Sequence, residues 1–112
     1  MLFVAGAALA LLLGCNSSSA DKRNAPLNPQ QAAGRRVFEM QCATCHTAYT
    51  SEARGGPPLK GLFERKELPS GAPANDARVR EAILEGRAKM PPFKYMLTEQ
   101  QVDDLLAYLH TL

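Results

Sequence analysis

The C-terminal end of the sequence carries the clearest periodic pattern of apolar residues. Apolar positions recur there at i, i+3, i+4 and i+7, the spacing of one face of an α-helix: they are Val102, Leu105, Leu106 and Leu109. Thr98 is a typical N-cap, and Gln101 completes a capping box with it. The pattern predicts a helix that begins after Thr98, with Asp103 and Asp104 turned away from the core.

Two further helices are predicted upstream. The first begins at Asn28, which can cap a helix, with Pro29 at the first helical position. Three of its residues share one face because they are spaced at i, i+4 and i+8: Gly34, Phe38 and Cys42. The second runs from Asn75 or Asp76 to Glu85, and Gly86 follows as a natural stop.

The segment between Thr50 and Ala74 is rich in glycine and proline and shows little periodicity, so it is predicted to be a long loop. Loops of that length in a compact domain usually wrap a ligand or have a function of their own. No strand pattern and no internal repeat is present. We therefore predict an all-α fold with three to four short helices and long loops.

The length and the charge of the chain limit the classes of function that can be expected. The 112 residues suffice for one domain, of a size at which a bound cofactor adds useful stability. The formal net charge is only +2, and basic and acidic residues are scattered rather than massed in a run. Nucleic acid is therefore not an expected partner.

The N-terminus predicts export. Residues 1–13 are almost wholly apolar but fall short of the roughly 20 residues that span a bilayer, so they indicate a signal peptide. The ending Leu12-Leu13-Gly14-Cys15 resembles a bacterial lipobox, which implies that Cys15 is acylated and anchors the protein to a membrane. The alternative is an ordinary cysteine in a signal cleaved elsewhere. We predict a signal peptide over residues 1–14, a flexible tether over 15–28 and one domain over 29–112.

The central motif is Cys42-Ala43-Thr44-Cys45-His46. The spacing Cys-x-x-Cys-His lets two thiols add to the vinyl groups of one haem while the histidine binds its iron, which predicts one covalent haem c. A thioredoxin-type dithiol would need a βαβ pattern, which the sequence lacks, and a zinc site would need four ligands where only His110 could join these three.

An iron bound by His46 needs a sixth ligand or keeps an open position. The candidates are Met40, Met90, Met96 and His110. Met40 lies too close to the attachment cysteines, Met96 is better placed for a core role, and His110 lies away from the apolar stripe of its helix. Met90 is favoured because the rigid Pro91-Pro92 pair follows it.

From Pro29 to Leu112 the sequence resembles the class I cytochrome c family. Gly34-Arg35-Arg36-Val37-Phe38 is similar to the family's N-terminal helix, and Leu105-Leu106-Ala107-Tyr108-Leu109 is similar to its C-terminal helix. The resemblance implies that Gly34 and Phe38 contact Leu105 and Tyr108.

Two other segments carry the same resemblance. Gly56-Pro57-Pro58-Leu59 is similar to the loop in which the carbonyl of the first proline, here Pro57, accepts a hydrogen bond from the ligand imidazole. Met90-Pro91-Pro92-Phe93 is similar to the segment that supplies the methionine ligand. Arg65 corresponds to a position that often contacts a haem propionate.

The resemblance implies single-electron transfer between redox partner proteins, not enzymatic catalysis. The protein is expected on the periplasmic side of a bacterial membrane, as a monomer or a complex subunit. Lys89 and Lys94 flank Met90 and would attract acidic partners, or be ordinary solvated lysines. Two alternatives stay open: a fixed subunit of a larger dehydrogenase or oxidase complex, and a haem that binds gases or acts on peroxide if Met90 is labile.

Overall fold

The computed structural model describes residues 21–112, and this part of the chain is all-α, as predicted. It contains three α-helices and two short 3₁₀ helices: η1 (Lys22–Asn24), α1 (Pro29–Gln41), η2 (Leu62–Glu64), α2 (Asp76–Glu85) and α3 (Glu99–Leu109). Within residues 21–112 no helix is long and apolar enough to cross a bilayer. The predicted signal peptide and Cys15 lie outside the described residues.

Local side-chain caps fix where the helices begin. Asn28 accepts a hydrogen bond from the backbone N–H of Gln31, whose side chain accepts one from the N–H of Asn28. Thr98 and Gln101 form the same reciprocal pair before α3. Each capping box satisfies backbone donors that the first turn of a helix leaves without partners. The start of α3 predicted from the sequence is confirmed.

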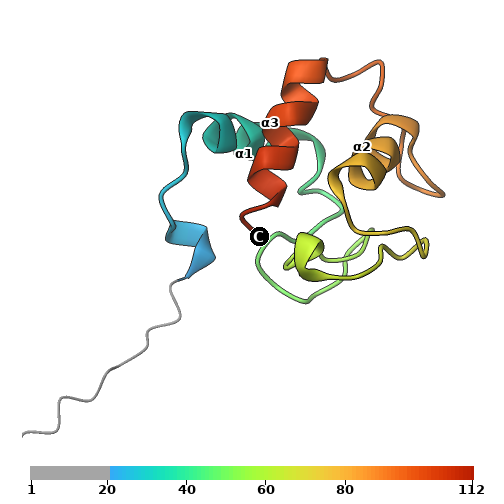
Figure 1. The fold of residues 1–112 in the computed structure, drawn as a ribbon, viewed down its shortest axis with the longest axis horizontal. Helices are drawn as coiled ribbons and strands as arrows, with labels where there is room; N and C mark the ends of the chain where they lie inside the picture. The colour runs from blue at the N-terminus through green and yellow to red at the C-terminus, as the bar shows by residue number, and fades with distance from the viewer. Residues whose placement is uncertain (1–20) are drawn as a thin grey trace, which may run out of the picture.

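The helices α1 and α3 pack directly against each other (Figure 1). A Cβ atom on Gly34 would overlap the backbone carbonyl of Asp104 and come within 2.9 Å of the Cβ of Tyr108. The rings of Phe38 and Tyr108 meet at 5.5 Å between centroids and a tilt of 57°. The predicted contact of Gly34 and Phe38 with Tyr108 is confirmed, and the nearest neighbour of Gly34 is the backbone of α3.

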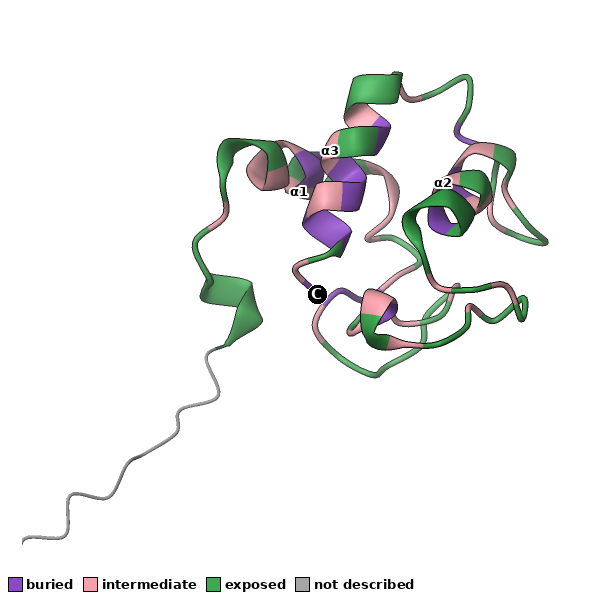
Figure 2. Cartoon of the chain, in the orientation of Figure 1, coloured by how far each residue is buried: buried purple, intermediate pink, exposed green. Residues whose placement is uncertain are grey.

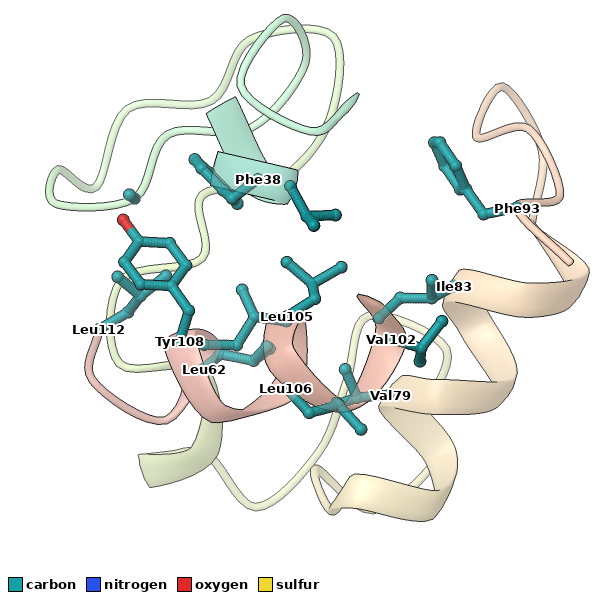
Figure 3. Close-up of a cluster of buried hydrophobic side chains, with 13 residues drawn as sticks. Phe38, Leu62, Val79, Ile83, Phe93, Val102, Leu105, Leu106, Tyr108 and Leu112 are labelled. Carbon is teal, nitrogen blue, oxygen red and sulfur yellow. The ribbon is translucent and has the colours of Figure 1, made fainter. Parts of the chain in front are cut away.

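One hydrophobic cluster joins the three helices. In Figure 2 the buried faces of α2 and α3 are turned inward. Figure 3 shows Phe38 of α1, Leu105 and Tyr108 of α3 and Ile83 of α2 pointing into the same interior. Leu105 and Tyr108 are each only 1% exposed, so α3 is the most deeply buried element. The predicted apolar stripe of this helix is therefore its core face.

The long loop between α1 and α2 is held mainly by backbone hydrogen bonds. The N–H of Leu59 donates to the carbonyl of Thr47 at 2.8 Å, and the buried hydroxyl of Thr47 donates to the carbonyl of Glu52 at 2.7 Å. Leu62 of η2 is buried in the core. The loop is therefore ordered, and its buried polar groups have hydrogen-bond partners, as buried polar groups in proteins usually do.

The structure differs from the predicted tether in the part of residues 15–28 that it describes. Asp21 caps η1, and the ammonium of Lys22 donates to the backbone carbonyl of Leu112 at 2.9 Å. The guanidinium of Arg23 lies 6.0 Å from the centre of the Tyr49 ring, and Leu27 packs against the core. Contacts with the domain therefore begin near residue 22 rather than at residue 29.

We predict that Gly34→Ala lowers the free energy of unfolding of the protein by about 1–3 kcal/mol, because the new methyl group would force α1 and α3 apart. Denaturant unfolding followed by circular dichroism would measure it. Arg36→Ala, on an exposed position of the same helix, is the control and should change the free energy by less than about 0.5 kcal/mol. Equal effects of the two substitutions would contradict the close approach at Gly34.

Candidate functional site

The Cys-x-x-Cys-His motif lies where α1 ends. Cys42 is the C-cap of this helix, and its N–H still donates to the carbonyl of Phe38 at 2.8 Å. The N–H groups of Cys45 and His46 both donate to the carbonyl of Cys42, at 3.1 and 2.9 Å. This one tight turn therefore brings both thiols and the imidazole together at the end of α1.

The two cysteines are free thiols with different surroundings. Cys45 is exposed, whereas Cys42 is half-buried against the hydrophobic cluster. Burial raises the pKa of the Cys42 thiol to about 11, because an apolar environment disfavours the charged thiolate. At neutral pH the Cys42 thiol of the folded chain is protonated.

A backbone carbonyl fixes the tautomer of a neutral His46 ring. The Nδ1 atom of His46 lies 2.7 Å from the carbonyl oxygen of Pro57. Since a carbonyl oxygen only accepts, Nδ1 must carry the proton, and Nε2 is left with its lone pair. The hydrogen bond expected for Pro57 is present, and it leaves Nε2 available to bind a metal.

The two glycines before Pro57 let the loop lie close to the motif. A Cβ on Gly56 would come within 2.6 Å of Cε1 of His46, and a Cβ on Gly55 within 3.2 Å of the sulfur of Cys45. The N–H of Gly56 also donates to the carbonyl of Cys45 at 2.8 Å. Sequence reasoning assigned these glycines no role of their own, although the Gly-Gly-Pro-Pro run marked the segment.

Among the candidate methionine ligands, Met90 is the one that lies next to the hydrophobic cluster. Its side chain is half-buried and packs, like Cys42, against the hydrophobic cluster. Met40 and Met96 are 68% and 54% exposed. The turn that carries Met90 follows α2, and Phe93 beyond it is buried. Burial thus separates Met90 from Met40 and Met96, and the core role expected for Met96 is wrong, because this residue is 54% exposed.

His110 has partners that the sequence did not reveal. Its ring stacks on Phe63, with 3.7 Å between ring centres and an interplanar angle of 11°. Its Nε2 atom lies 2.6 Å from a carboxylate oxygen of Asp76. His110 is exposed, and these two contacts connect the end of α3 to η2 and to the start of α2.

Arg65 makes two hydrogen bonds within its own loop. Its Nη2 group donates to the carbonyls of Pro58 and Lys60, at 2.7 and 2.8 Å. Its Nε and Nη1 donors have no partner among residues 21–112, which leaves a guanidinium edge that a carboxylate can approach. Its contact with a haem propionate stays a prediction.

These residues fit a covalently attached haem. Two free thiols stand on one turn beside an imidazole whose Nε2 lone pair is available, and a half-buried thioether borders the same hydrophobic cluster. Among residues 21–112 no group of three or more His, Cys, Asp and Glu side chains is arranged to hold a metal ion. An iron inside a macrocycle needs only the two axial protein ligands.

Comparison with known proteins gives the family. The sequence profile of the family Cytochrome c matches residues 31–112. The chain is 31% identical over 78 residues to cytochrome c6 of Rippkaea orientalis, covering 70% of this chain and 67% of that protein. It is 33% identical over 82 residues to cytochrome c6 of Leptolyngbya boryana, covering 70% of this chain and 87% of that protein.

A second group of relatives consists of much longer proteins. The chain is 34% identical over 79 residues to the cytochrome bc1 complex cytochrome c subunit of Corynebacterium diphtheriae, covering 70% of this chain. The match covers 26% of that subunit. The similarity is therefore confined to about a quarter of the longer relative.

We predict that Gly56→Ala displaces the His46 ring, because the new Cβ would come within 2.6 Å of Cε1. The His46–iron bond should weaken by about 10-fold or more, as is typical when the groups that orient a metal ligand are lost. Competition with added imidazole, followed by the visible spectrum, would measure this. Gly55→Ala is the matched control and should change much less, since its Cβ would come no closer than 3.2 Å to any atom of Cys45.

Proposed function

Because the chain belongs to the cytochrome c family, we propose that it carries single electrons on an iron held between the side chains of His46 and Met90. The cofactor of the family is haem c, attached through a Cys-x-x-Cys-His motif, and Cys42, Cys45 and His46 match that motif. When bound, haem c supplies an iron that accepts and returns one electron. The protein is an electron carrier rather than an enzyme.

The contact between His46 and Pro57 carries the proposal. The Pro57 carbonyl holds the imidazole in one orientation and in the tautomer that leaves Nε2 unprotonated. It also makes Nε2 a stronger donor to iron, because the hydrogen bond raises the basicity of the ring. A ligand fixed in this way keeps its geometry when the iron changes its charge, so little reorganisation accompanies electron transfer.

Met90 is proposed as the second axial ligand. Its half-buried side chain stands against the hydrophobic cluster that Cys42 also borders. The chain turns at Met90 and then continues through Pro91 and Pro92, whose rings restrict the backbone and lower the entropy lost on ligation. Two protein ligands would leave the iron no open position for a substrate, which suits electron transfer alone.

We further propose that the protein works outside the cytoplasm, held to a bacterial membrane by a lipid on Cys15. The sequence Leu12-Leu13-Gly14-Cys15 after an apolar stretch supports this. Cys15 lies outside the described residues. A lipidated carrier would exchange electrons with redox partners within reach of the same membrane.

The exposed charges near Met90 favour one lysine for partner contact. Lys94 pairs with Glu85 at 3.0 Å and lies 5.4 Å from the centre of the Tyr95 ring, so its charge is partly neutralised. Lys89 is exposed and has no ion-pair partner among residues 21–112. Acidic partners would therefore meet Lys89 more readily than Lys94.

A second candidate function is that of a fixed subunit of a larger redox complex. The 34% identity to the cytochrome c subunit of a bc1 complex favours it. Gentle detergent extraction followed by size-exclusion chromatography separates the two: a stoichiometric complex supports the subunit, and a free monohaem protein supports the carrier.

The visible and near-infrared spectra test the axial ligands. The reduced protein should show a c-type spectrum and bind carbon monoxide very slowly, and the oxidised protein should show a methionine-to-iron charge-transfer band. Met90→Ala should abolish the band and allow rapid carbon monoxide binding, because it opens the sixth position. Met96→Ala, in the same region but 54% exposed, is the control and should keep the wild-type spectrum.

Rapid carbon monoxide binding by the wild-type protein would instead favour gas binding or peroxide chemistry as its function. Loss of the band in Met96→Ala, with the band kept in Met90→Ala, would move the ligand to Met96. Absence of covalent haem after expression with haem-attachment machinery would contradict the central proposal.

The anchor is tested by Cys15→Ser. We expect wild-type protein in the membrane fraction of a bacterial host and labelled by radioactive palmitate, and Cys15→Ser unlabelled and released to the soluble fraction, since the acyl chains supply the membrane affinity. The visible spectrum should be unchanged in the variant. Ser17→Ala, two residues away, should behave as wild type. A variant that stays in the membrane fraction would contradict lipidation of Cys15.

A further inference from the structure

Met90 ends a tight turn that the chain closes by itself. The N–H of Met90 donates to the carbonyl of Arg87 at 2.8 Å, and the N–H of Arg87 donates to the carbonyl of Met90 at 3.1 Å. Both backbone polar groups of Met90 thus bond to the same residue. Only Ala88 and Lys89 lie between, so the position of the Met90 α-carbon is fixed relative to Arg87.

The turn contains a backbone conformation that is unfavourable for its residue. Ala88 has φ of +52°, and no other non-glycine residue within 21–112 has a positive φ. The left-handed region brings a Cβ close to the following carbonyl oxygen, so an alanine is held there only when the surrounding contacts require it. The contacts around the turn therefore impose this geometry on Ala88.

The backbone of the Met90 segment lies directly against Gly86. It ends α2 with φ of +70°. A Cβ at this position would lie 2.5 Å from the carbonyl oxygen of Met90, 2.7 Å from the nitrogen of Pro92 and 2.8 Å from the carbonyl carbon of Pro91. All three atoms belong to backbone, which cannot move aside as a flexible side chain can. No residue with a Cβ fits here while the segment keeps its place.

The far end of the segment returns to the same helix. The N–H of Phe93 donates to the carbonyl of Ile83 at 3.0 Å, and the N–H of Lys94 donates to the carbonyl of Leu84 at 3.2 Å. These are carbonyls of the last turn of α2, which have no partner within the helix. The loop from Gly86 to Phe93 is therefore closed on the end of α2 at both of its ends.

We propose that Gly86 and Ala88 are positioning residues for Met90: the bare α-carbon of Gly86 and the left-handed turn at Ala88 hold the Met90 thioether where the sixth ligand of the iron must be. The proposal rests on Met90 as the sixth ligand. The fraction of time that Met90 occupies the iron is then set by whether this loop is closed on α2. A change at Gly86 should act like a partial loss of Met90, although Gly86 itself binds nothing.

Gly86→Ala in the haem-loaded protein tests the proposal. We expect carbon monoxide to bind the reduced variant about 10-fold or more faster than wild type, with a weaker methionine charge-transfer band, in line with the effect of losing a ligand's support. Gly71→Ala is the matched control, because Gly71 also has a positive φ of +82°, but a Cβ on Gly71 would meet nothing within 4 Å. It also places a Cβ at a positive φ, but without the contact with the Met90 segment.

A double-mutant cycle shows whether the effect passes through Met90. In the Met90→Ala background, Gly86→Ala should leave the carbon monoxide rate unchanged, because the ligand it positions is already gone. Ala88→Gly provides a second variant in case Gly86→Ala does not fold. Since glycine adopts a positive φ without penalty, the closed turn should form more readily and carbon monoxide should bind at most as fast as to wild type.

Three results would overturn the inference: equal acceleration by Gly86→Ala and Gly71→Ala, acceleration by Gly86→Ala that persists in the Met90→Ala background, or faster carbon monoxide binding by Ala88→Gly. If Met90→Ala alone leaves carbon monoxide binding unchanged, the proposed ligand itself fails. The two failures are therefore distinguishable from the same set of variants.

Discussion

The direct packing of α1 against α3 at Gly34 is the contact on which the rest of the structure depends. With no side chain on Gly34, the carbonyl of Asp104 can lie against the backbone of α1, and the rings of Phe38 and Tyr108 then meet beside it. Because α1 ends at Cys42, this crossing also sets the position of the attachment motif relative to the core. The haem site is thus an extension of the helix pair.

The helices and the attachment motif could be predicted because their information is local. The caps at Asn28 and Thr98 lie within one turn of the helices they begin, and Cys42 to His46 are consecutive. The family resemblance alone pointed to Pro57, and the resemblance together with the Pro91-Pro92 pair pointed to Met90. For Pro57 the hydrogen bond to His46 is present in the structure, whereas for Met90 the structure supplies a half-buried position and the ligation is a proposal.

Contacts between distant loops could not be predicted in the same way. Lys22 reaches the carbonyl of Leu112, and His110 stacks on Phe63, across separations in sequence at which no periodic pattern connects the partners. Gly86 was identified as a helix stop, yet its contact with the Met90 segment depends on a loop that folds back onto the end of α2. Such contacts depend on how the whole chain folds, and no pattern of neighbouring residues in the sequence indicates them.

The half-buried position of Cys42 has a consequence for the order in which the protein is assembled. Thiolates are the reactive form of cysteine, and burial raises the pKa of this thiol to about 11 in the folded chain. Cys42 is therefore more reactive before the hydrophobic cluster against which it packs has formed, and that cluster includes residues of α3, far downstream in the sequence. The chemistry of the thiol favours a biogenesis in which the cofactor joins an open chain.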